Sequence, residues 1–450
     1  MLPEQRRMLL VVAAGTAFVA ALIYIRHRSV RSSTVQTTSK GQKDSITRVS
    51  VKTVAPPRPA PMTTEALRTG RVVIVGGGIS GLSTALALQR SGLDAQVYER
   101  YGHLQGRATG FSIWAYAIKR LIEWGFTDER LHAIGREIQE THIVDDRNNL
   151  LLVMPIHEAS MEVQAPSFDV DRRKLQEQMI ELLGPQNYHY HSEVVGVEEN
   201  ELEATITLAN GSRVTGDLVV GCDGIHSMVR DSYLQQRIEL ANGETDVIQG
   251  IAPRTKYLSK GHHVQVWGSR ARFGVGWIDD ERVRWFIGGN GIALKNEPPI
   301  SKAELLQKVE NLGLPAVVKA TIEATDEDQI FRVQHHHGYP PKKWHSDRVV
   351  LLGDSCHTMS PFAGMGACAA IEDASHFTRI LLEASSVPDA LAAFQESRQG
   401  DVVEIERKAR HNERMMHPSN SLVYWVRNKI FRHTSGLGAR LAKQMTSGQD

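Results

Sequence analysis

Hydrophobic residues follow three different patterns along this chain of 450 residues. Met8 to Ile25 is an apolar stretch without a charged residue, long enough to cross the hydrocarbon core of a bilayer as a helix. Residues 29–70 are polar and proline-rich, a composition that cannot bury a core. From Arg71 onward, short β-branched runs alternate with segments of helical periodicity, which is typical of an α/β protein. We therefore predict a membrane anchor over residues 1–28, a disordered linker and a folded body.

Basic residues on both sides of the apolar stretch set its expected orientation. Arg6 and Arg7 precede it. Four basic residues follow it: Arg26, His27, Arg28 and Arg31. By the positive-inside rule, this asymmetry favours a single-pass helix with the folded body facing the cytosol. Two alternatives stay open, because the lack of acidic residues between Gln5 and Lys43 also suits a mitochondrial presequence, and the apolar stretch also suits a secretory signal.

The folded body opens with a strand, a glycine-rich turn and a helix. Arg71 to Val75 is a β-branched run expected of a buried parallel strand, and Gly76-Gly77-Gly78-Ile79-Ser80-Gly81 follows it directly. In this G-x-G-x-x-G pattern, Gly76 permits a tight turn, Gly78 lets a pyrophosphate approach the backbone, and Gly81 lets the helix pack against the strand. The helix N-terminus then offers N–H groups and a positive dipole end to the phosphates.

A second strand completes this predicted dinucleotide-binding unit. Residues 95–99 read as a strand, and Glu99 ends it about 20 residues after the glycines. A carboxylate at that position can accept hydrogen bonds from both hydroxyls of an adenosine ribose, and it disfavours a ribose 2′-phosphate. The pattern therefore predicts a bound dinucleotide other than NADP. The alternative is a glycine turn without a ligand.

Composition narrows the class of function. The formal net charge is +1, which gives no global field for binding nucleic acid. The three cysteines, Cys222, Cys356 and Cys368, are too few for a disulfide framework, and their spacing does not resemble a metal site. The run from His335 to His337 has no partner ligands at useful spacing, so we predict a solvent-exposed loop. We expect free thiols, no metal and no nucleic-acid partner.

Two later segments end predicted strands in chemically useful residues. Residues 217–230 (DLVVGCDGIHSMVR) predict a strand that runs into a turn. Residues 348–374 predict a strand ending at Gly353-Asp354, then a loop with Pro361, then a long helix opened by Gly364-Met365-Gly366. Asp354 can accept hydrogen bonds from ribityl hydroxyls, and glycines let backbone N–H groups approach a flavin without a Cβ clash. The alternative is glycines that serve packing alone.

Together the three segments resemble the fingerprints of the class A flavoprotein monooxygenases, the para-hydroxybenzoate hydroxylase-like family. This family includes salicylate and urate hydroxylases, kynurenine monooxygenase and zeaxanthin epoxidase. The resemblance lies in the glycine motif (Gly76 to Gly81), the DG motif (Cys222-Asp223-Gly224) and the GD motif (Gly353-Asp354 through Gly366), and it covers about residues 71–410. Ser355 and Cys356 depart from the alanines that the family often has there.

The resemblance implies an α/β fold in which a Rossmann-like FAD-binding domain is interleaved with a mixed β-sheet substrate domain, inserted at roughly residues 240–330. A helical tail is expected over residues 411–450. The implied cofactor is FAD. The residues of this chain that match FAD-binding positions of the family are Gly76, Gly78, Gly81, Glu99, Arg172, Asp223, Asp354, Gly364, Met365 and Gly366.

These positions have distinct implied roles. Glu99 binds the adenosine ribose, and Arg172, at an R-x-x-L helix start, contacts FAD. Asp223 and Arg230 shape the region shared by FAD and the nicotinamide cofactor. Asp354 binds the ribityl chain, and the segment from Gly364 to Gly366 lies beside the flavin.

The resemblance also implies a reaction. NAD(P)H docks transiently and reduces the flavin, O₂ is captured as a C4a-hydroperoxyflavin, and one oxygen atom hydroxylates or epoxidises a small organic substrate. The membrane anchor suggests a lipophilic substrate. No catalytic side chain is predicted, since the family has no universal base. The alternatives are an FAD-dependent reductase of polyprenyl double bonds and a membrane-anchored FAD-binding scaffold.

The substrate side is expected on strands that meet at a hairpin between Val264 and Gly288. Arg270 and Arg272 on these strands either face an anionic substrate or, as we favour, lie in solvent. Leu422 to Phe431 has an apolar helix face (Leu422, Trp425, Val426, Ile430) that either docks on the body, as we favour, or touches the membrane. The candidate liners of the substrate cavity are aromatic: Trp267, Phe273, Trp277, Trp285 and Phe286.

Overall fold

The computed structural model describes residues 70–104, 109–236, 238, 241–242, 247–292, 300–333, 336–337, 340–358, 364–416 and 420–448. The predicted membrane anchor, nearly all of the predicted linker and Pro361 therefore lie outside the described residues. Within the described ranges, no helix is both long enough and apolar enough to span a membrane.

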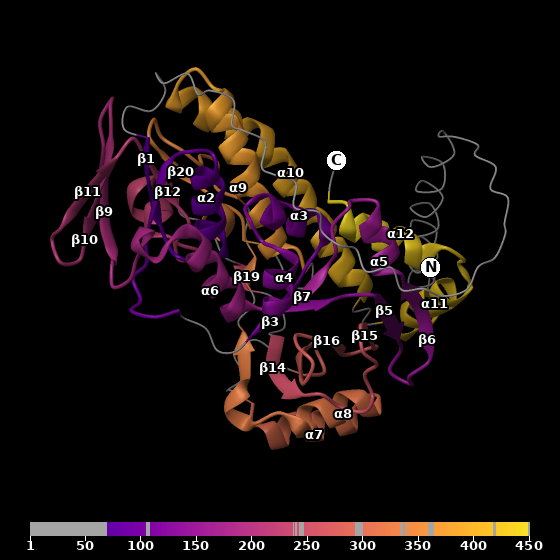
Figure 1. The fold of residues 1–450 in the computed structure, drawn as a ribbon. Helices are drawn as coiled ribbons and strands as arrows, with labels where there is room; N and C mark the ends of the chain where they lie inside the picture. Colours follow the sequence, from indigo (N-terminus) through magenta and orange to yellow (C-terminus); the bar gives the residue numbers. More distant parts are fainter. Residues whose placement is uncertain are drawn as a thin grey trace, which may run out of the picture. The chain divides into compact units, whose positions relative to one another are not determined.

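A parallel sheet of five strands carries the glycine motif, in the order β20-β12-β1-β2-β8. Figure 1 labels β1, β12 and β20 of this sheet near α2. Each neighbouring pair of strands in it is parallel. The central strands are short and rich in fully buried valine, leucine and isoleucine, as expected of a sheet covered on both faces. The strands are β1 (Arg71–Val75), β2 (Asp94–Tyr98), β8 (Tyr188–His189), β12 (Leu218–Gly221) and β20 (Val349–Leu351).

The predicted strand–turn–helix–strand unit is confirmed. The glycine turn leads into α2 (Ile79–Arg90), which ends before Gly92, whose φ of +88° suits a glycine at a helix end. The next strand, β2, ends one residue before Glu99. The helix α2 packs against α6 (Arg172–Leu183) and the long helix α9 (Gly366–Glu383).

The order of the strands brings the three sequence motifs together. In the parallel sheet β1, β12 and β20 are neighbours and run in the same direction. Gly76 follows β1, Asp223 lies two residues after β12, and Asp354 lies three residues after β20. Because carboxyl ends of neighbouring parallel strands share one edge, these motifs meet although they are far apart in sequence.

A larger mixed sheet of seven strands forms the second half, in the order β18-β14-β17-β16-β15-β5-β6. The hairpin predicted between Val264 and Gly288 is confirmed, since β16 and β17 are antiparallel and joined at Asp279-Asp280. Two strands from earlier in the chain also join, because β5 pairs in parallel with β15. The strands are β5 (Glu140–Val144), β6 (Leu150–Met154), β14 (Val247–Pro253), β15 (His262–Trp267), β16 (Arg272–Trp277), β17 (Arg282–Gly288) and β18 (Ile330–Val333).

The two faces of this larger sheet have different character. One face packs its apolar side chains, such as Phe273, Val275 and Trp285, against α7 (Lys302–Asn311) and α8 (Ala316–Ala324). Figure 1 shows these two helices along one side of the sheet. Alternate residues on the same strands point the other way, because successive side chains of a strand face opposite sides. Those residues are mostly polar, and they face a cavity described below.

Smaller elements complete the described structure. The strands β3 (Gly110–Ile113), β7 (Phe168–Asp171) and β4 (Gly135–Glu137) form a three-stranded sheet. His336–His337 is β19, paired with β13 (Ala241–Asn242), so this part of the histidine run is a strand and not the predicted loop; His335 lies outside the described residues. The remaining strands and helices are β9 (Val194–Glu199), β10 (Ala204–Leu208), β11 (Arg213–Gly216), α3 (Ala115–Glu123), α4 (Asp128–Ile134) and α5 (Ile156–Met161).

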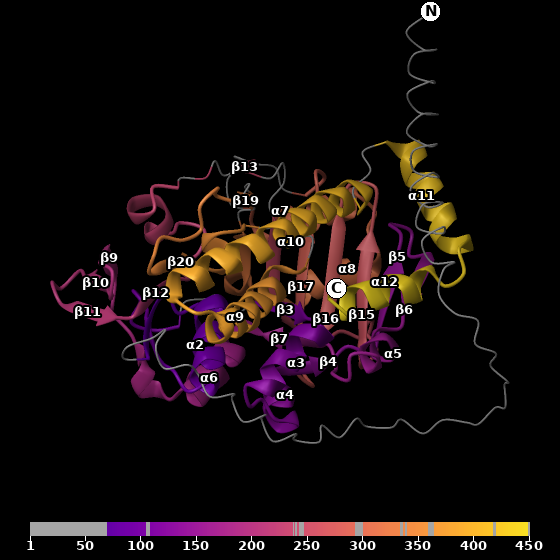
Figure 2. The same cartoon turned by 90° about the horizontal axis from the view of Figure 1, so that it is seen from above.

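Three helices follow one another at the C-terminal end: α10 (Val387–Met416), α11 (Ser421–His433) and α12 (Leu437–Thr446), as Figure 2 shows. The helix α12 packs against α5 and β6. The helix α11 docks on the body through Arg427 and Asn428, which are buried. Leu422 and Trp425, which belong to the expected docking face, are about half exposed at 49% and 54%. The expected face was therefore wrong for these two residues, although the helix does dock.

Candidate active site

The glycine turn has the geometry that its sequence predicts. Gly76 has φ of +102°, and a Cβ there would come within 2.5 Å of the Cys222 carbonyl oxygen. A Cβ on Gly81 would lie 2.0 Å from the Gly76 carbonyl oxygen, so only glycine lets α2 start this close to β1. A Cβ on Gly78 would meet no atom within 4 Å. Gly76 and Gly81 thus shape the turn, and Gly78 borders open space.

A first cavity, of about 480 Å³, lies beside this turn. Glu99 lines it, and its carboxylate accepts hydrogen bonds from the backbone N–H groups of Gly77 (2.8 Å) and Tyr101 (3.0 Å). These bonds hold the carboxylate at the mouth of the turn. Asp223 lines the same cavity from the other side, so the DG and glycine motifs face one space.

Asp223 has one oxygen engaged and one oxygen unpaired. Its Oδ2 accepts hydrogen bonds from the N–H groups of Met228 (2.7 Å) and Val229 (3.2 Å). Its Oδ1 is buried without a partner among the described residues. Burial raises the pKa of Asp223 above its ordinary value, although the hydrogen bonds oppose this. A buried oxygen without a partner is costly, and this one belongs to a residue that lines a cavity, as expected of a carboxylate beside a bound ligand.

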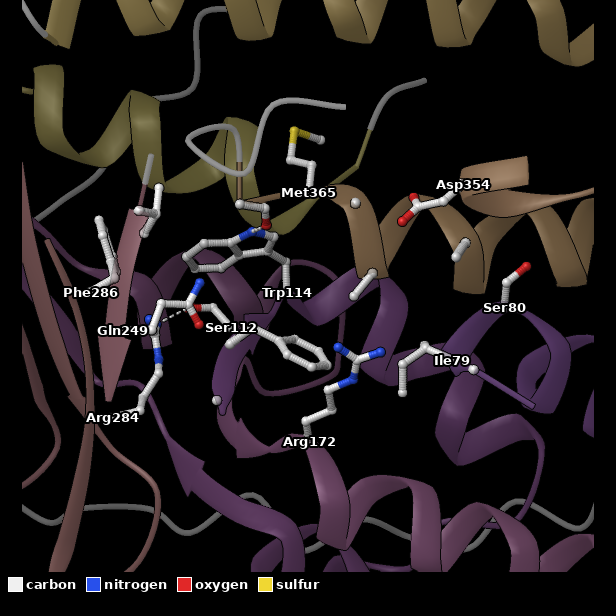
Figure 3. A pocket seen from close by; sticks show the side chains of 18 of the residues that line it. Ile79, Ser80, Ser112, Trp114, Arg172, Gln249, Arg284, Phe286, Asp354 and Met365 are labelled. Atoms are coloured by element: carbon white, nitrogen blue, oxygen red, sulfur yellow. Dashed lines mark hydrogen bonds between the residues drawn. The ribbon is translucent and has the colours of Figure 1, made fainter. Parts of the chain in front are cut away.

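A second cavity, of about 420 Å³, extends from the GD motif to the larger sheet. Figure 3 shows Asp354 and Ser80 at one end and Gln249, Arg284 and Phe286 at the other, with further side chains between them. The segment from Gly364 to Gly366 also lines it, and a Cβ on either glycine would meet nothing within 4 Å.

The two cavities meet and form one path. Four residues line both: Gly78, Arg172, Cys222 and Gly224. Arg172 begins α6, and its guanidinium makes no side-chain hydrogen bond to the other described residues. Arg172 is exposed to the space of the cavities; the protein atoms around it lower its pKa by desolvation, while the Asp354 carboxylate opposes this. An arginine retains its charge under such conditions. A cation thus stands at the junction, where a dinucleotide places its pyrophosphate.

The loop that carries Asp354 is held from behind by a buried ionic network. Asp373 on α9 is hydrogen-bonded to His357, accepts from Arg398 Nε (2.7 Å) and accepts from the Gly353 N–H (3.2 Å). Burial alone would raise the pKa of Asp373, but His357 and Arg398 hold it well below its ordinary value. Asp354 has no such partner among the described residues: it is exposed to the cavity that it lines, and desolvation by the surrounding protein atoms raises its pKa. The network positions the loop and leaves the Asp354 carboxylate for the cavity.

Arg230 takes a different place from the one expected. It is 2% exposed, and it donates to the carbonyl oxygens of Ile225 (2.8 Å) and Ser355 (3.2 Å). It lines neither of these two cavities. Arg230 therefore ties the DG loop to the GD loop and does not itself line either cavity; its predicted role toward the nicotinamide cofactor stays a prediction.

The described residues fit FAD on their own evidence. The joined cavities run past three groups of cradle residues: Glu99 and Asp223, then Gly78 and Arg172, then Asp354 with the Gly364–Gly366 segment. Two buried oxygens at the walls, Asp223 Oδ1 and Ser80 Oγ, have no partner among the described residues. Glu99 and Asp223 match an adenosine, Gly78 and Arg172 match a pyrophosphate, and Asp354 with the Gly364–Gly366 segment matches a ribityl-flavin.

The far end of the second cavity is a polar wall on the larger sheet. It contains Gln249, His263, Gln265, Arg272 and Arg284. Arg272 is 6% exposed, so the expectation that both Arg270 and Arg272 lie in solvent was wrong for Arg272; Arg270 is exposed. Arg272 donates to Gln265 Oε1 (2.8 Å), and its guanidinium lies over the Phe286 ring at 5.4 Å.

Of the five aromatic candidates for this wall, Phe286 lines the cavity. Phe273, Trp277 and Trp285 are buried in the core under α7 and α8, and Trp267 packs against Phe431. Other liners were not predicted from the sequence, among them Phe111, Ser112, Trp114, Gln249, His263, Gln265 and Arg284. A signal existed for those on the larger sheet, since alternate residues of β15, β16 and β17 are polar or glycine, but alternation alone does not tell which face meets solvent.

Comparison with known proteins agrees with this geometry. Residues 69–409 match the FAD binding domain family. The chain is 31% identical over 370 residues to the aurachin C monooxygenase/isomerase of Stigmatella aurantiaca, covering 82% of this chain and 96% of that protein. It is 25% identical over 352 residues to an FAD-dependent urate hydroxylase of Mycolicibacterium vanbaalenii, covering 76% and 87% of the two chains.

One solved structure with this fold is Klebsiella pneumoniae HpxO complexed with FAD and uric acid. It has a TM-score of 0.76 at 23% identity, covering 84% of this chain and 96% of that one. At such identity the likeness concerns the fold, and the assignment rests on the family match and the relatives. The chain therefore belongs to the FAD binding domain family and is an FAD-dependent monooxygenase.

Proposed function

We propose that this enzyme uses NAD(P)H and O₂ to hydroxylate an electron-rich ring that carries polar groups. One observation carries the proposal: the polar side chains of Gln249, His263 and Gln265 line the same cavity as the Gly364–Gly366 segment. A substrate held at that wall would lie against the flavin. Bound FAD supplies the reduction of oxygen and the transfer of one oxygen atom to substrate.

The cofactor-binding roles are part of this proposal. Glu99 binds the adenosine ribose and Asp223 its neighbouring groups, through the free Oδ1. Arg172 neutralises the pyrophosphate at the junction of the two cavities, beside the backbone at Gly78. Asp354 binds the ribityl hydroxyls. Gly364, Met365 and Gly366 lie beside the isoalloxazine.

Side chains around the second cavity would keep water from the reacting atoms. Trp114 is buried and donates from its indole Nε1 to the Gly364 carbonyl oxygen at 3.1 Å, which fixes the ring beside the glycine segment. Phe111 and Phe286 supply apolar walls, Met365 lines the cavity from the residue before α9, and Met445 lines it from α12. A dry site favours oxygen transfer to substrate over wasteful release of peroxide.

Epoxidation is the second candidate. Zeaxanthin epoxidase of Solanum lycopersicum is 31% identical to this chain over 330 residues, although the chain spans 48% of that protein. An alkene has no polar group that could form hydrogen bonds with the two glutamines, the histidine and the two arginines of the polar wall. Burying these side chains against an apolar ligand would cost binding free energy. The polar wall therefore favours hydroxylation.

The test uses the purified full-length protein. We expect it to retain FAD, to have its flavin reduced by NADH or NADPH, and to take up oxygen in proportion to hydroxylated product when offered phenols, purines and quinolines. Isoprenoid alkenes are the comparison set. Colourless protein that takes up no FAD would contradict the cofactor assignment, and turnover of alkenes alone would select epoxidation.

We also propose membrane attachment, with residues 1–28 as a single-pass anchor and the catalytic body on the cytosolic side. The apolar stretch and its basic flanks support this. On α11, Leu422, Val423 and Trp425 are about half exposed, and Lys429 lies over the Trp425 ring at 4.3 Å, a combination typical of the membrane interface.

Extraction of membranes distinguishes a spanning anchor from peripheral attachment and from a mitochondrial presequence. The full chain should stay in the membrane pellet after high-salt and alkaline washes, and Val19→Arg, in the middle of the apolar stretch, should release it. Thr34→Arg in the linker is the matched control and should stay in the pellet. Release of the unaltered chain by salt would contradict a spanning anchor, and import into mitochondria with loss of the N-terminus would select the presequence.

A further inference from the structure

Within the proposed hydroxylation, on which this inference rests, we propose that His263 is a catalytic residue. It accepts a proton from an acidic O–H or N–H group of the substrate, while the Gln265 amide donates a hydrogen bond to a second polar group of the same ring. The substrate class is thus a flat ring that carries both an acidic hydrogen and a separate acceptor.

The first observation is the state of the imidazole. His263 is 2% exposed and lines the second cavity from β15. Neither ring nitrogen has a hydrogen-bond partner among the described residues. A buried imidazole with two unmade hydrogen bonds costs stability, because desolvation is not repaid. A histidine kept only for packing would not incur that cost. Both nitrogens are covered in the free protein, so the ring must turn toward the cavity for one of them to meet a substrate group.

The second observation is the ionic support behind the ring. Asp169 on β7 is 1% exposed, and its Oδ2 lies 3.9 Å from His263 Nδ1. Its Oδ1 accepts hydrogen bonds from Arg284 Nε (3.0 Å) and Ser112 Oγ (2.7 Å). Figure 3 shows Arg284 and Ser112 together at this end of the cavity, joined by a hydrogen bond. Burial alone would raise the pKa of Asp169, but Arg284 holds it below its ordinary value, so the carboxylate is ionised and faces the ring.

Glycine makes room for this pair. A Cβ on Gly276 of β16 would lie 1.8 Å from Asp169 Oδ2 and 3.5 Å from His263 Cδ2. The strand next to β15 thus has no side chain at the point where the carboxylate approaches the imidazole. The close approach is built into the sheet.

The free protein holds His263 neutral, as a proton acceptor must be. Burial lowers the pKa of His263 to about 4, Asp169 opposes the shift, and Arg284 and Arg272 add to it. Among the described residues, these three side chains, from β7, β17 and β16, are the charged groups that act on the imidazole. When a proton arrives from the substrate, the substrate anion that forms beside the ring and the Asp169 carboxylate 3.9 Å away together stabilise the imidazolium by their charge, which raises the pKa of His263 in the complex.

Gln265 is oriented by its neighbours. Its Oε1 accepts hydrogen bonds from Trp267 Nε1 (2.9 Å) and from Arg272 (2.8 Å). The amide nitrogen therefore remains as a donor beside the cavity. Gln265 and His263 stand two residues apart on one strand, so their side chains emerge on the same face about 7 Å apart at the backbone. An acceptor and a donor at that separation match two groups across a small flat ring.

The proton step is balanced as follows. The substrate O–H or N–H bond breaks, its proton moves to the imidazole, and its electron pair stays on the substrate heteroatom. The ring becomes more electron-rich, which favours attack on an electrophilic oxygen. After transfer, the imidazolium returns the proton to the product. No additional oxidant or reductant is needed for this step.

The probe for the test is 7-hydroxycoumarin, a flat ring with an acidic O–H at one end and a carbonyl at the other. Its ionised form absorbs at longer wavelength than its neutral form. Mixed with the FAD-loaded full-length enzyme, at a pH where the free dye is mostly neutral, the bound dye should show the spectrum of the ionised form. 7-Methoxycoumarin has the same ring without the acidic hydrogen, and it should bind at least about tenfold more weakly, roughly 1.4 kcal/mol.

Variants assign the effect to the residue. His263→Gln should leave the bound dye neutral and reduce its affinity to that of the methoxy compound. Asp169→Asn should reduce the ionised fraction while Asn can still bind Ser112. His262→Gln is the matched control, because it alters the preceding residue, whose side chain contacts His142 on the opposite face of the sheet, and it should behave as the unaltered enzyme.

The outcomes that overturn the inference are distinct from failure of the proposed function. FAD content and flavin reduction are measured first on the same sample, and they test the proposed function alone. If a yellow, reducible enzyme binds both coumarins equally, binds neither, or binds 7-hydroxycoumarin in its neutral form, His263 is not the proton acceptor. A bound dye that stays ionised in a folded His263→Gln variant would also overturn it.

Discussion

Gly78 and Gly81 lie three residues apart in one turn, yet a methyl group would meet different surroundings at each. At Gly81 it would overlap the Gly76 carbonyl oxygen, and at Gly78 it would point into open space beside both cavities. The first glycine serves the packing of α2 on β1, and the second serves approach of the cofactor. The two roles can be separated by experiment.

Gly81→Ala should destabilise the protein even without FAD, by about 1–3 kcal/mol, because the added methyl overpacks backbone that cannot move freely. Gly78→Ala should leave the stability of the apoprotein nearly unchanged and weaken FAD binding by about tenfold. Chemical denaturation of the apoproteins and fluorescence titration with FAD measure the two effects. Equal effects of both substitutions on apoprotein stability would contradict the separate roles.

Substitution of Asp354 should weaken the binding of the flavin half of the cofactor most. Asp354→Ala removes a carboxylate that lines the second cavity, so the purified protein should have a lower ratio of flavin to protein absorbance. Asp347→Ala is the matched control, because Asp347 is exposed and lies just before β20, the strand that Asp354 follows. Full flavin content in Asp354→Ala would rule out the ribityl assignment.

Among the elements, α12 connects the C-terminal tail to the site. Met445 on α12 lines the second cavity, and a Cβ on Gly438 of the same helix would lie 1.8 Å from the Val153 carbonyl oxygen of β6. The helix therefore needs glycine at this contact to reach the position from which Met445 closes the cavity. Its docking and the dryness of the site are linked.

Gly438→Ala should push α12 off β6 and admit water. We expect more NAD(P)H consumed for each product molecule formed, with the balance released as peroxide. Gly400→Ala on α10 introduces the same methyl where nothing lies within 4 Å, so coupling there should be unchanged. The measurement is the amount of peroxide released for each product molecule formed. An identical ratio in the two variants would argue against a role for α12 in closing the cavity.

At the scale of the whole molecule, buried ionisable groups make stability depend on pH. The pKa of His263 falls from 6.5 unfolded to about 4 folded, so the unfolded chain binds more protons between these values. Stability from this group is therefore present above about pH 6.5 and is lost as the pH falls toward 4, about 3 kcal/mol in all. Asp169 and Asp373, whose pKa values are lowered, add losses at still lower pH.

Denaturation midpoints measured across this pH range should fall with the pH, and His263→Gln should fall less steeply than the unaltered protein. His189 and His376 also have pKa values lowered by burial and contribute in the same direction, but they are more exposed. Parallel pH profiles for the variant and the unaltered protein would show that His263 does not titrate as described.

The sequence allowed prediction of the cofactor half better than of the substrate half, for a physical reason. At Gly76 and Gly81 a backbone requirement excludes every other residue, so the pattern in the sequence is specific. On β16, Arg272, Gly274 and Gly276 alternate with Phe273, Val275 and Trp277, which predicts a two-faced strand. Both faces are covered in the folded chain, one by α7 and α8 and one by the cofactor half.

Contacts between distant segments account for what remained unpredicted. The pairing of β5 with β15 joins residues more than a hundred positions apart, and Arg284 meets Asp169 across a similar separation. No local pattern specifies such partners. On α11, periodicity grouped Leu422 with Trp425 correctly, but it could not tell that the body binds the side carrying Arg427.

The wall that faces the substrate is built on hydrogen-bonded strands and not on loops, and this has a consequence for how the enzyme can change. Exchanging Gln249 or Phe286 for another residue replaces one chemical group while the sheet and the core beneath it keep their shape. New preferences can therefore arise in single steps without loss of folding. A small library confined to these strand positions should yield many folded, flavin-loaded variants that differ in the compounds they oxidise.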